Sequence, residues 1–334
     1  MTFSIGEIHP NTPHLLADLA ELMLAAGYIG RTTLHKNDIE SLLQQGTITA
    51  EELDEEQDAQ EEASALKLSS AEKSNRLERQ LEDVLFQFAY RSKALSDYYP
   101  FIVVDEQIEL KPNLNERERV YKLLLSCSRL RSFEGKGVPQ RWAKSFARLC
   151  STAMESLLPP AATTRIFDAN SDDRKTYYST DLKQALRRLG TDLGVLSCVE
   201  TEIEKCGSSG DAGIDLVGSI NFDDGAAVHY AILGQCGAQE TNWPAKRLEA
   251  HSLNLRSFFT IQFDYPSVMF TPVCYRNSTG EWVDNKHTNG VLMADRGRIL
   301  NLLEANSSWD EITNADWFTE FEVEFESLQK QQIS

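Results

Sequence analysis

One acidic and one amide side chain occupy neighbouring segments of strand-like sequence. Asp215 stands between two apolar residues, and Gln235 lies near the end of the largely apolar segment 228–236. The Asp-Asp-Gly sequence at 223–225 suits the positive φ angles of a tight turn, so the two segments are predicted to pair as a hairpin. A buried carboxylate is costly unless it is paired or bound to a metal ion. The pattern indicates either a metal-binding aspartate or, more simply, an aspartate that caps or turns the chain.

Further polar and aromatic residues near this hairpin are candidates for a site. Asp211, within Gly-Asp-Ala-Gly, is typical of a turn and could also support a neighbouring site. Lys246 is either a surface lysine or a cation that reaches the site from the next helix, and Trp243 is interpreted as packing or as a substrate contact. Asp295 and Arg296 are expected to form an internal ion pair, with a phosphate contact by Arg296 as the alternative. Gln235 itself could merely end its strand.

Hydrophobic periodicity predicts a mixed α/β chain. Helix-like spacing occurs at 14–26, 37–45, 72–88, 115–130, 139–157, 180–193, 242–258, 296–304 and 308–328. Strand-like segments occur at 98–104, 107–110, in the hairpin, and at 267–275 and 290–294. This order is typical of an α/β core with a mixed sheet, preceded by helices. We expect a helical N-terminal region with an acidic linker at 1–70, a helical region leading into the core at 71–160, and the core at 161–334.

Composition excludes several classes of protein. A chain of 334 residues, 41% apolar and 25% charged, can bury a sizeable core. It has no apolar run approaching the roughly 18 residues of a membrane helix, and no signal-peptide pattern at its start. Its six cysteines are dispersed, without CxxC spacing or a nearby histidine pair, which predicts reduced thiols in a cytoplasm and argues against a zinc site. We therefore expect a cytoplasmic protein without a membrane partner.

The net charge of −18 limits how the chain could meet nucleic acid. A free-standing nucleic-acid binder is usually basic, because phosphate contact is mainly electrostatic. Part of the acid lies in segment 51–62, which is either a solvated helix face or linker, or a patch that docks a basic partner or mimics nucleic acid. If the substrate is nucleic acid, we expect a basic partner protein or a helicase/ATPase to deliver it.

The order of helix, Asp-bearing strand, second strand ending in Gln-Cys-Gly, helix and strand resembles the PD-(D/E)XK (restriction-endonuclease-like) nuclease superfamily. The string GDAGID…GQCGAQETNWPAK is similar to uncharacterised bacterial restriction or defence proteins with the pattern GDxGxD…GQC…NWxxK. The segments YYPF (98–101), YKLLLSCSRLR (121–131) and ADRGRIL (294–300) extend the resemblance over about residues 75–304. It implies a restriction-endonuclease-like mixed central sheet, flanked by helices and preceded by a helical N-terminal region.

The resemblance also implies a metal site. Asp215 takes the position of the metal-binding aspartate, and Gln235-Cys236-Gly237 replaces the Glu-x-Lys of the superfamily. Glutamine is a known variant there, and its amide oxygen and the Cys236 backbone carbonyl would join Asp215 around Mg²⁺ or Mn²⁺. Gly237 cannot supply the lysine. Lys246 would instead position the attacking water and offset charge in the transition state.

One departure from the pattern concerns the helix before the core. The similar proteins carry Phe-Glu-x-Leu there, with the glutamate facing the metal, whereas residues 146–149 read Phe-Ala-Arg-Leu. Ala147 therefore stands where a carboxylate would help to hold the cation. Either this branch has lost the ligand or the chain carries an inactivating substitution, and we expect weaker metal binding and little cleavage.

The sequence is compatible with two functions. The resemblance implies a metal-dependent nuclease (an endonuclease), as a subunit of a bacterial anti-phage or restriction system acting on nucleic acid, DNA before RNA. The alternative is a non-catalytic nuclease-fold scaffold or interaction subunit of a multi-protein complex. Ala147, Gln235 and the acidic segment 51–62 favour this alternative.

Overall fold

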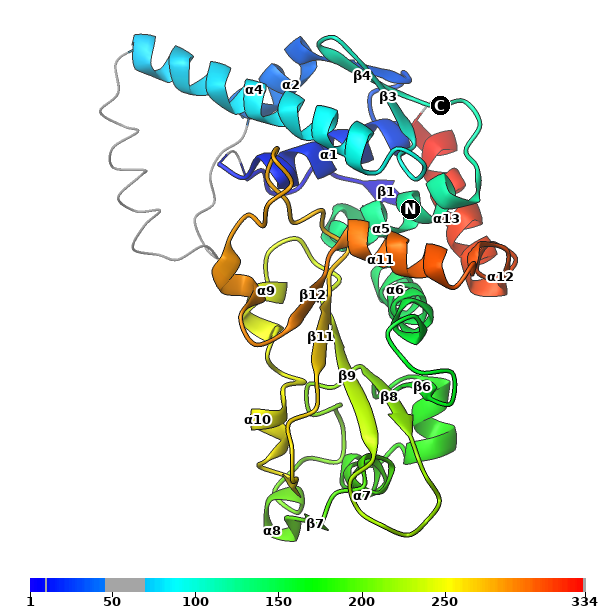
Figure 1. Cartoon of the computed structure of the whole chain (residues 1–334). Helices are drawn as coiled ribbons and strands as arrows, with labels where there is room; N and C mark the ends of the chain where they lie inside the picture. The colour runs from blue at the N-terminus through cyan, green and yellow to red at the C-terminus, as the bar shows by residue number, and fades with distance from the viewer. Residues whose placement is uncertain (10, 46–69, 333–334) are drawn as a thin grey trace.

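The computed structural model describes residues 1–9, 11–45 and 70–332, and the acidic segment 51–62 lies outside them. The described part is a mixed α/β structure. In Figure 1 the N-terminal helices, the long helix α4 and the C-terminal helices gather at one end, and the largest sheet extends away from them. None of the helices in the described ranges is long and apolar enough to cross a membrane. None of the six cysteines forms a disulfide in the structure.

Most predicted helices are present, but the helices predicted at 242–258 and 308–328 are each divided into two. The helices of the described residues are α1 (Pro13–Ala25), α2 (Lys36–Gln45), α4 (Ser70–Ala94), α5 (Glu116–Ser128), α6 (Val138–Glu155), α7 (Leu182–Leu193), α8 (Glu200–Ile203), α9 (Trp243–Lys246), α10 (Ser252–Leu255), α11 (Arg296–Ala305), α12 (Trp309–Thr313) and α13 (Asp316–Gln332). The continuous helix predicted at 242–258 is replaced by α9 and α10. His251 begins α10 as its N-cap, with Nδ1 accepting the Leu253 N–H at 3.1 Å, so the chain turns there instead of continuing.

The largest sheet has five strands in the order β12–β11–β9–β8–β6. Its strands are β6 (Thr163–Ile166), β8 (Leu216–Ile220), β9 (Tyr230–Cys236), β11 (Ser267–Phe270) and β12 (Leu292–Ala294). Strands β6, β8 and β9 pair antiparallel, and β11 runs parallel to both β9 and β12. The smaller sheets pair β1 (Thr2–Phe3) with β5 (Phe133–Glu134), β7 (Ser197–Cys198) with β10 (Phe259–Thr260), and β2 (Thr33–His35) and β3 (Phe101–Val104) with β4 (Gln107–Leu110).

The predicted hairpin exists, but its turn is not tight. Strands β8 and β9 pair antiparallel, and the loop between them covers 221–229. Asp215 lies immediately before β8 rather than within the strand. The last loop residues bond elsewhere: the Val228 N–H donates to Gly194 O at 2.7 Å, and the His229 N–H donates to Leu193 O at 3.3 Å. Because the end of α7 takes these hydrogen bonds, the strand pairing ends earlier than the alternation of residues predicts.

Helices cover both faces of this sheet. Helix α6 packs against β6, β8 and β9, and α7 packs against β8. Side chains of β9 alternate accordingly: Ile232 belongs to the core with α6, and Leu233 belongs to the core with α7. The larger core includes residues from Phe3 to Leu328, so it draws on all three regions expected from the sequence. The boundaries proposed near 70 and 160 stay predictions.

Candidate metal centre

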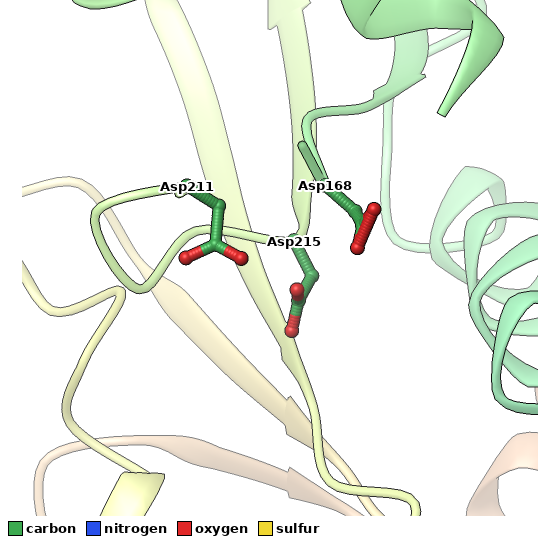
Figure 2. A group of neighbouring side chains, drawn as sticks. All are labelled: Asp168, Asp211 and Asp215. Carbon is green, nitrogen blue, oxygen red and sulfur yellow. The ribbon is translucent and has the colours of Figure 1, made fainter. Parts of the chain in front are cut away.

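Three aspartates meet where β6, β8 and β9 come together. Asp168 follows β6 by two residues, Asp211 lies in the turn that leads to β8, and Asp215 directly precedes β8. One carboxylate oxygen from each lies within 4.8 Å of the others, and Figure 2 shows the three side chains gathered around a common space. We call these residues the acidic triad. Carboxylate oxygens in such a group are ligands that Mg²⁺ and Mn²⁺ prefer.

Hydrogen bonds from two neighbouring strands fix Asp215. Its Oδ2 accepts the Cys236 N–H at 2.7 Å, and its own N–H donates to Gly234 O at 3.0 Å. Its carbonyl accepts the Phe167 N–H at 2.6 Å, which places the neighbouring Asp168 beside it. The backbone of β9 therefore sets the direction of the Asp215 carboxylate, while the chain after β6 is held against Asp215.

Asp211 forms a turn, as the sequence predicts, and also belongs to the triad. Its Oδ1 accepts the Gly213 N–H at 2.9 Å, which is the local hydrogen bond of an Asx turn. Gly213 has φ +77°, and a Cβ there would lie 2.6 Å from Glu249 Cβ. A glycine is required at this position, because both the backbone angle and the close approach of Glu249 exclude a side chain.

Arg174 ties the two loops of the triad together. Its side chain is fully buried, and its guanidinium donates to Phe167 O at 2.9 Å and to Gly210 O at 3.2 Å. These carbonyls belong to the residues that immediately precede Asp168 and Asp211. A third donation, from Nε to Ser179 O at 2.7 Å, fixes the guanidinium. Arg174 thus holds the backbone of two triad members in register and places a positive charge near their carboxylates.

The electrostatics of the triad oppose full ionisation in the absence of a cation. Burial raises the pKa of the Asp215 carboxyl to about 7, and the nearby charges of Asp211 and Asp168 act in the same direction. The hydrogen bond from the Cys236 N–H lowers this pKa and only partly offsets the rise. A bound divalent cation would reverse this balance, because it favours the ionised form of every carboxylate around it.

A cavity of about 540 Å³ opens beside the triad, between α6 and the chain that follows β6. Asp168, Asp215 and Cys236 line it, and α6 contributes Ala147 to the opposite wall. The structure thus brings Ala147 to the same cavity as Asp215, as the resemblance implies for this helix position. An alanine here leaves open the space that a longer carboxylate side chain would occupy.

Gln235 and Cys236 are placed differently with respect to this cavity. Cys236 lines it, and Gln235 does not. Side chains alternate along a strand, so the two residues face opposite sides of β9. Gln235 is buried, and its Oε1 has no hydrogen-bond partner among the described residues. The metal-ligand roles of Gln235 and of the Cys236 carbonyl stay predictions.

The cations at the cavity differ from the one expected. Lys246 ends the short helix α9, its side chain is exposed, and it does not line the cavity. Lys144, Arg148 and Lys175 do line it. The catalytic role predicted for Lys246 is therefore not supported by its position.

Trp243 is 2% exposed and packs edge-on against Tyr275, with ring centroids 4.7 Å apart, as its interpretation as a packing residue requires.

The predicted pairing of Asp295 with Arg296 is wrong. Asp295 pairs with Arg276 at 2.9 Å and caps α11, whereas Arg296 pairs with Asp18 at 2.7 Å. The side chain of Arg296 is fully buried, so the predicted contact with a substrate phosphate is also wrong. Both errors have one cause: the partner on α1 is 278 positions away in sequence and is brought near by tertiary packing alone.

Asp168 is the functional candidate that sequence reasoning missed. It follows the short strand β6, whose sequence Thr-Thr-Arg-Ile is rich in β-branched residues. An acidic residue close after such a strand, followed by the turn-forming Asn170 and Ser171, is the signal that could have indicated it.

Comparison with models of protein families, with curated proteins and with solved structures finds no significant match to this chain.

Proposed function

We propose that this chain is a divalent-metal-dependent phosphodiesterase of the PD-(D/E)XK type, with the acidic triad as its metal site. The observation that carries the proposal is the meeting of three carboxylate oxygens within 4.8 Å, two of the three aspartates also lining a cavity. The proposed substrate is nucleic acid, DNA before RNA. The proposed cofactor is Mg²⁺ or Mn²⁺.

The residues present fit such a cation. The triad offers hard oxygen ligands, and its like charges need a positive partner, since burial already raises the pKa of Asp215 to about 7. The missing helix carboxylate at Ala147 is offset by Asp168 and Asp211, which raise the number of acidic candidates at the site from one to three. The triad therefore supports an active form in spite of Ala147.

The chemistry can be divided between the cation and the protein. A bound Mg²⁺ or Mn²⁺ would polarise a phosphate oxygen and lower the pKa of a bound water molecule. The protein residues would hold the cation and are themselves oriented by hydrogen bonds. The Cys236 N–H orients the Asp215 carboxylate, and Arg174 fixes the loops of Asp168 and Asp211. This arrangement puts the acidic groups in place before any cation binds, which reduces the reorganisation that binding requires.

The topology of the sheet agrees with this proposal. An antiparallel run of β6, β8 and β9 followed by a parallel β11 is the kind of mixed central sheet that the resemblance implies. We further propose that the chain works in the cytoplasm as a subunit of a bacterial anti-phage or restriction system. Because its net charge is −18, a basic partner protein or a helicase/ATPase would bring it to long nucleic acid.

A second candidate function is a nuclease-fold scaffold without catalysis. Two placements favour it: Ala147 brings no carboxylate to the cavity wall, and Lys246 lies outside the cavity. A scaffold would not need to bind a cation at the triad. The two functions therefore differ in a property that is measured directly.

The deciding experiment combines metal titration with cleavage of plasmid and single-stranded DNA in Mn²⁺. Four proteins are compared: the natural chain, Ala147→Glu, and each of these with Asp215→Ala. A nuclease binds Mn²⁺ and cuts, more strongly with Ala147→Glu, and loses both properties with Asp215→Ala. Mn²⁺ binding that is unaffected by Asp215→Ala, with no cleavage by any of the four even with candidate partners added, would establish the scaffold instead.

A further inference from the structure

The α6 side of the cavity carries positive charge, whereas Asp172 and Asp173 line the cavity from the chain after β6. Lys144 and Arg148 lie one turn apart on the exposed side of α6, and both line the cavity. Neither has a carboxylate within ion-pair distance among the described residues. Lys175, on the other side of the cavity, differs because it pairs with Asp172 at 3.0 Å. Two exposed cations without ion-pair partners therefore stand above an acidic site in a chain with a net charge of −18.

Two alanines that directly precede these cations in sequence leave space along the wall of α6. Ala143 and Ala147 line the cavity on the same helix as Lys144 and Arg148. Their short side chains let a ligand approach the helix closely while the two long side chains reach over it. The rise of an α-helix separates Lys144 from Arg148 by about 6 Å along its axis. That spacing is comparable with the separation of successive phosphates on a nucleic-acid strand.

We propose that Lys144 and Arg148 bind backbone phosphates of a nucleic-acid strand whose neighbouring phosphate lies over the acidic triad. This inference rests on the proposed function, and it names the substrate class and the side of the cavity along which the strand runs. A metal ion alone would need only the triad. A row of phosphates needs the added cations, because the acidic floor would otherwise repel it.

Ionic strength explains how an acidic chain can bind a strand at this place. At about 0.1 M salt, charges more than roughly 10 Å apart are largely screened from each other. A short strand on the rim would then interact with Lys144 and Arg148 directly, while acidic groups elsewhere on the surface contribute little. A long duplex would meet more of the acidic surface, so a short single strand is the appropriate probe.

The test measures binding of a fluorescent hexathymidylate to the full chain by anisotropy, over a series of salt concentrations without divalent metal. The variant is Lys144→Gln with Arg148→Gln. The matched control is Lys93→Gln with Lys286→Gln, which removes the same charge from exposed positions that do not line the cavity. We expect the rim variant to lose about tenfold in affinity, and its salt slope to fall by about 0.7 for each lost contact. The control should stay within about twofold of the natural chain.

Parallel titrations with Mn²⁺ separate this inference from the proposed function. The rim variant should keep its Mn²⁺ affinity, whereas Asp215→Asn should lose Mn²⁺ binding and keep hexathymidylate binding. Equal binding of the oligonucleotide by the rim and control variants would overturn the phosphate role of α6, as would the absence of binding by the natural chain. Inorganic phosphate that competes as strongly as the oligonucleotide would also overturn it, because the site would then take single phosphates and not a strand.

Discussion

Two groups of acidic residues in this molecule differ in whether arginine side chains pair with their carboxylates. Asp18 and Glu21 on α1 are fully buried, and they meet the guanidinium groups of Arg91 and Arg296. We call these four residues the paired network. In the acidic triad, three carboxylates approach one another, and the guanidinium of Arg174, near Asp168 and Asp211, donates hydrogen bonds to backbone carbonyls instead.

The difference appears in the ionisation of the two groups. Burial alone would raise the pKa of Asp18, but Arg296 and Arg91 hold it below its usual value. The pKa of Asp215 moves the other way, to about 7, because the carboxyl is buried and the charges of Asp211 and Asp168 act in the same direction. The paired network satisfies its charges within the fold and connects α1, α4 and α11. The triad instead gathers like charges, and a perturbed carboxyl pKa beside a cavity is the arrangement on which the proposed metal site rests.

The largest expected effect comes from breaking the paired network. Arg91→Met leaves two buried carboxylates short of a partner, and we expect the free energy of unfolding to fall by about 3–5 kcal/mol. Urea denaturation at neutral pH measures this change. Arg256→Met is the control, because its pair with Asp264 is exposed and should contribute under about 1 kcal/mol. An equal, small effect of both substitutions would mean that the network is not a structural element.

Neutralising one carboxylate of the triad should raise the free energy of unfolding, whereas Arg91→Met should lower it. Asp215→Asn removes a buried charge that its neighbours repel, so the metal-free protein should become more stable by roughly 1–3 kcal/mol at pH 8. The folded-state pKa of Asp215 is raised, so the proton-bound form adds stability at low pH that is lost as pH rises through about 7. The difference between variant and parent should therefore shrink towards pH 5. Thermal unfolding between pH 5 and 8 measures this difference, with Asp83→Asn as an exposed control. An Asp215→Asn protein that is less stable than the parent at pH 8 would contradict the prediction.

Arg174 is expected to align the loops that carry Asp168 and Asp211. Arg174→Lys keeps a positive charge but cannot donate to the carbonyls of Phe167, Ser179 and Gly210 together. We expect Mn²⁺ to bind roughly 10–100-fold more weakly, because the loops of Asp168 and Asp211 lose their alignment. Calorimetric titration at a temperature where the variant is folded separates this effect from stability. Unchanged affinity would show that Arg174 serves the fold only.

The smallest expected effect is the change in metal binding over a single pH unit. Below a pH of about 7 a proton competes with the cation for Asp215, so Mn²⁺ affinity should fall by up to about tenfold for each pH unit. Above that pH the affinity should level off. Titrations at half-unit intervals would measure this, and a flat profile between pH 5 and 8 would remove Asp215 from the set of ligands.

The local sequence determined a large part of this structure. Helix-like spacing at 115–130 predicted α5, and the capping box of Asn115 and Glu118 that begins this helix is local, because its hydrogen bonds join residues three positions apart. The amphipathic spacing of α6 placed Ala147 on a defined face of the helix, and that face and Asp215 line the same cavity. The alternation of side chains along β9 could likewise be predicted, because successive side chains of a strand point to opposite faces of the sheet.

Tertiary structure alone decided the composition of the site and the partners of its charges. Asp168 joins Asp215 because the Phe167 N–H pairs with the Asp215 carbonyl, a contact between strands that no local pattern encodes. Arg296 reads as a partner for the adjacent Asp295, yet packing of α11 against α1 gives it to Asp18. Sequence patterns report which residues share a helix face or a strand face, because that follows from backbone geometry. Which charges meet depends on how distant elements pack, and here packing brought arginines to Asp18 and Glu21 and brought the three aspartates of the triad to one another.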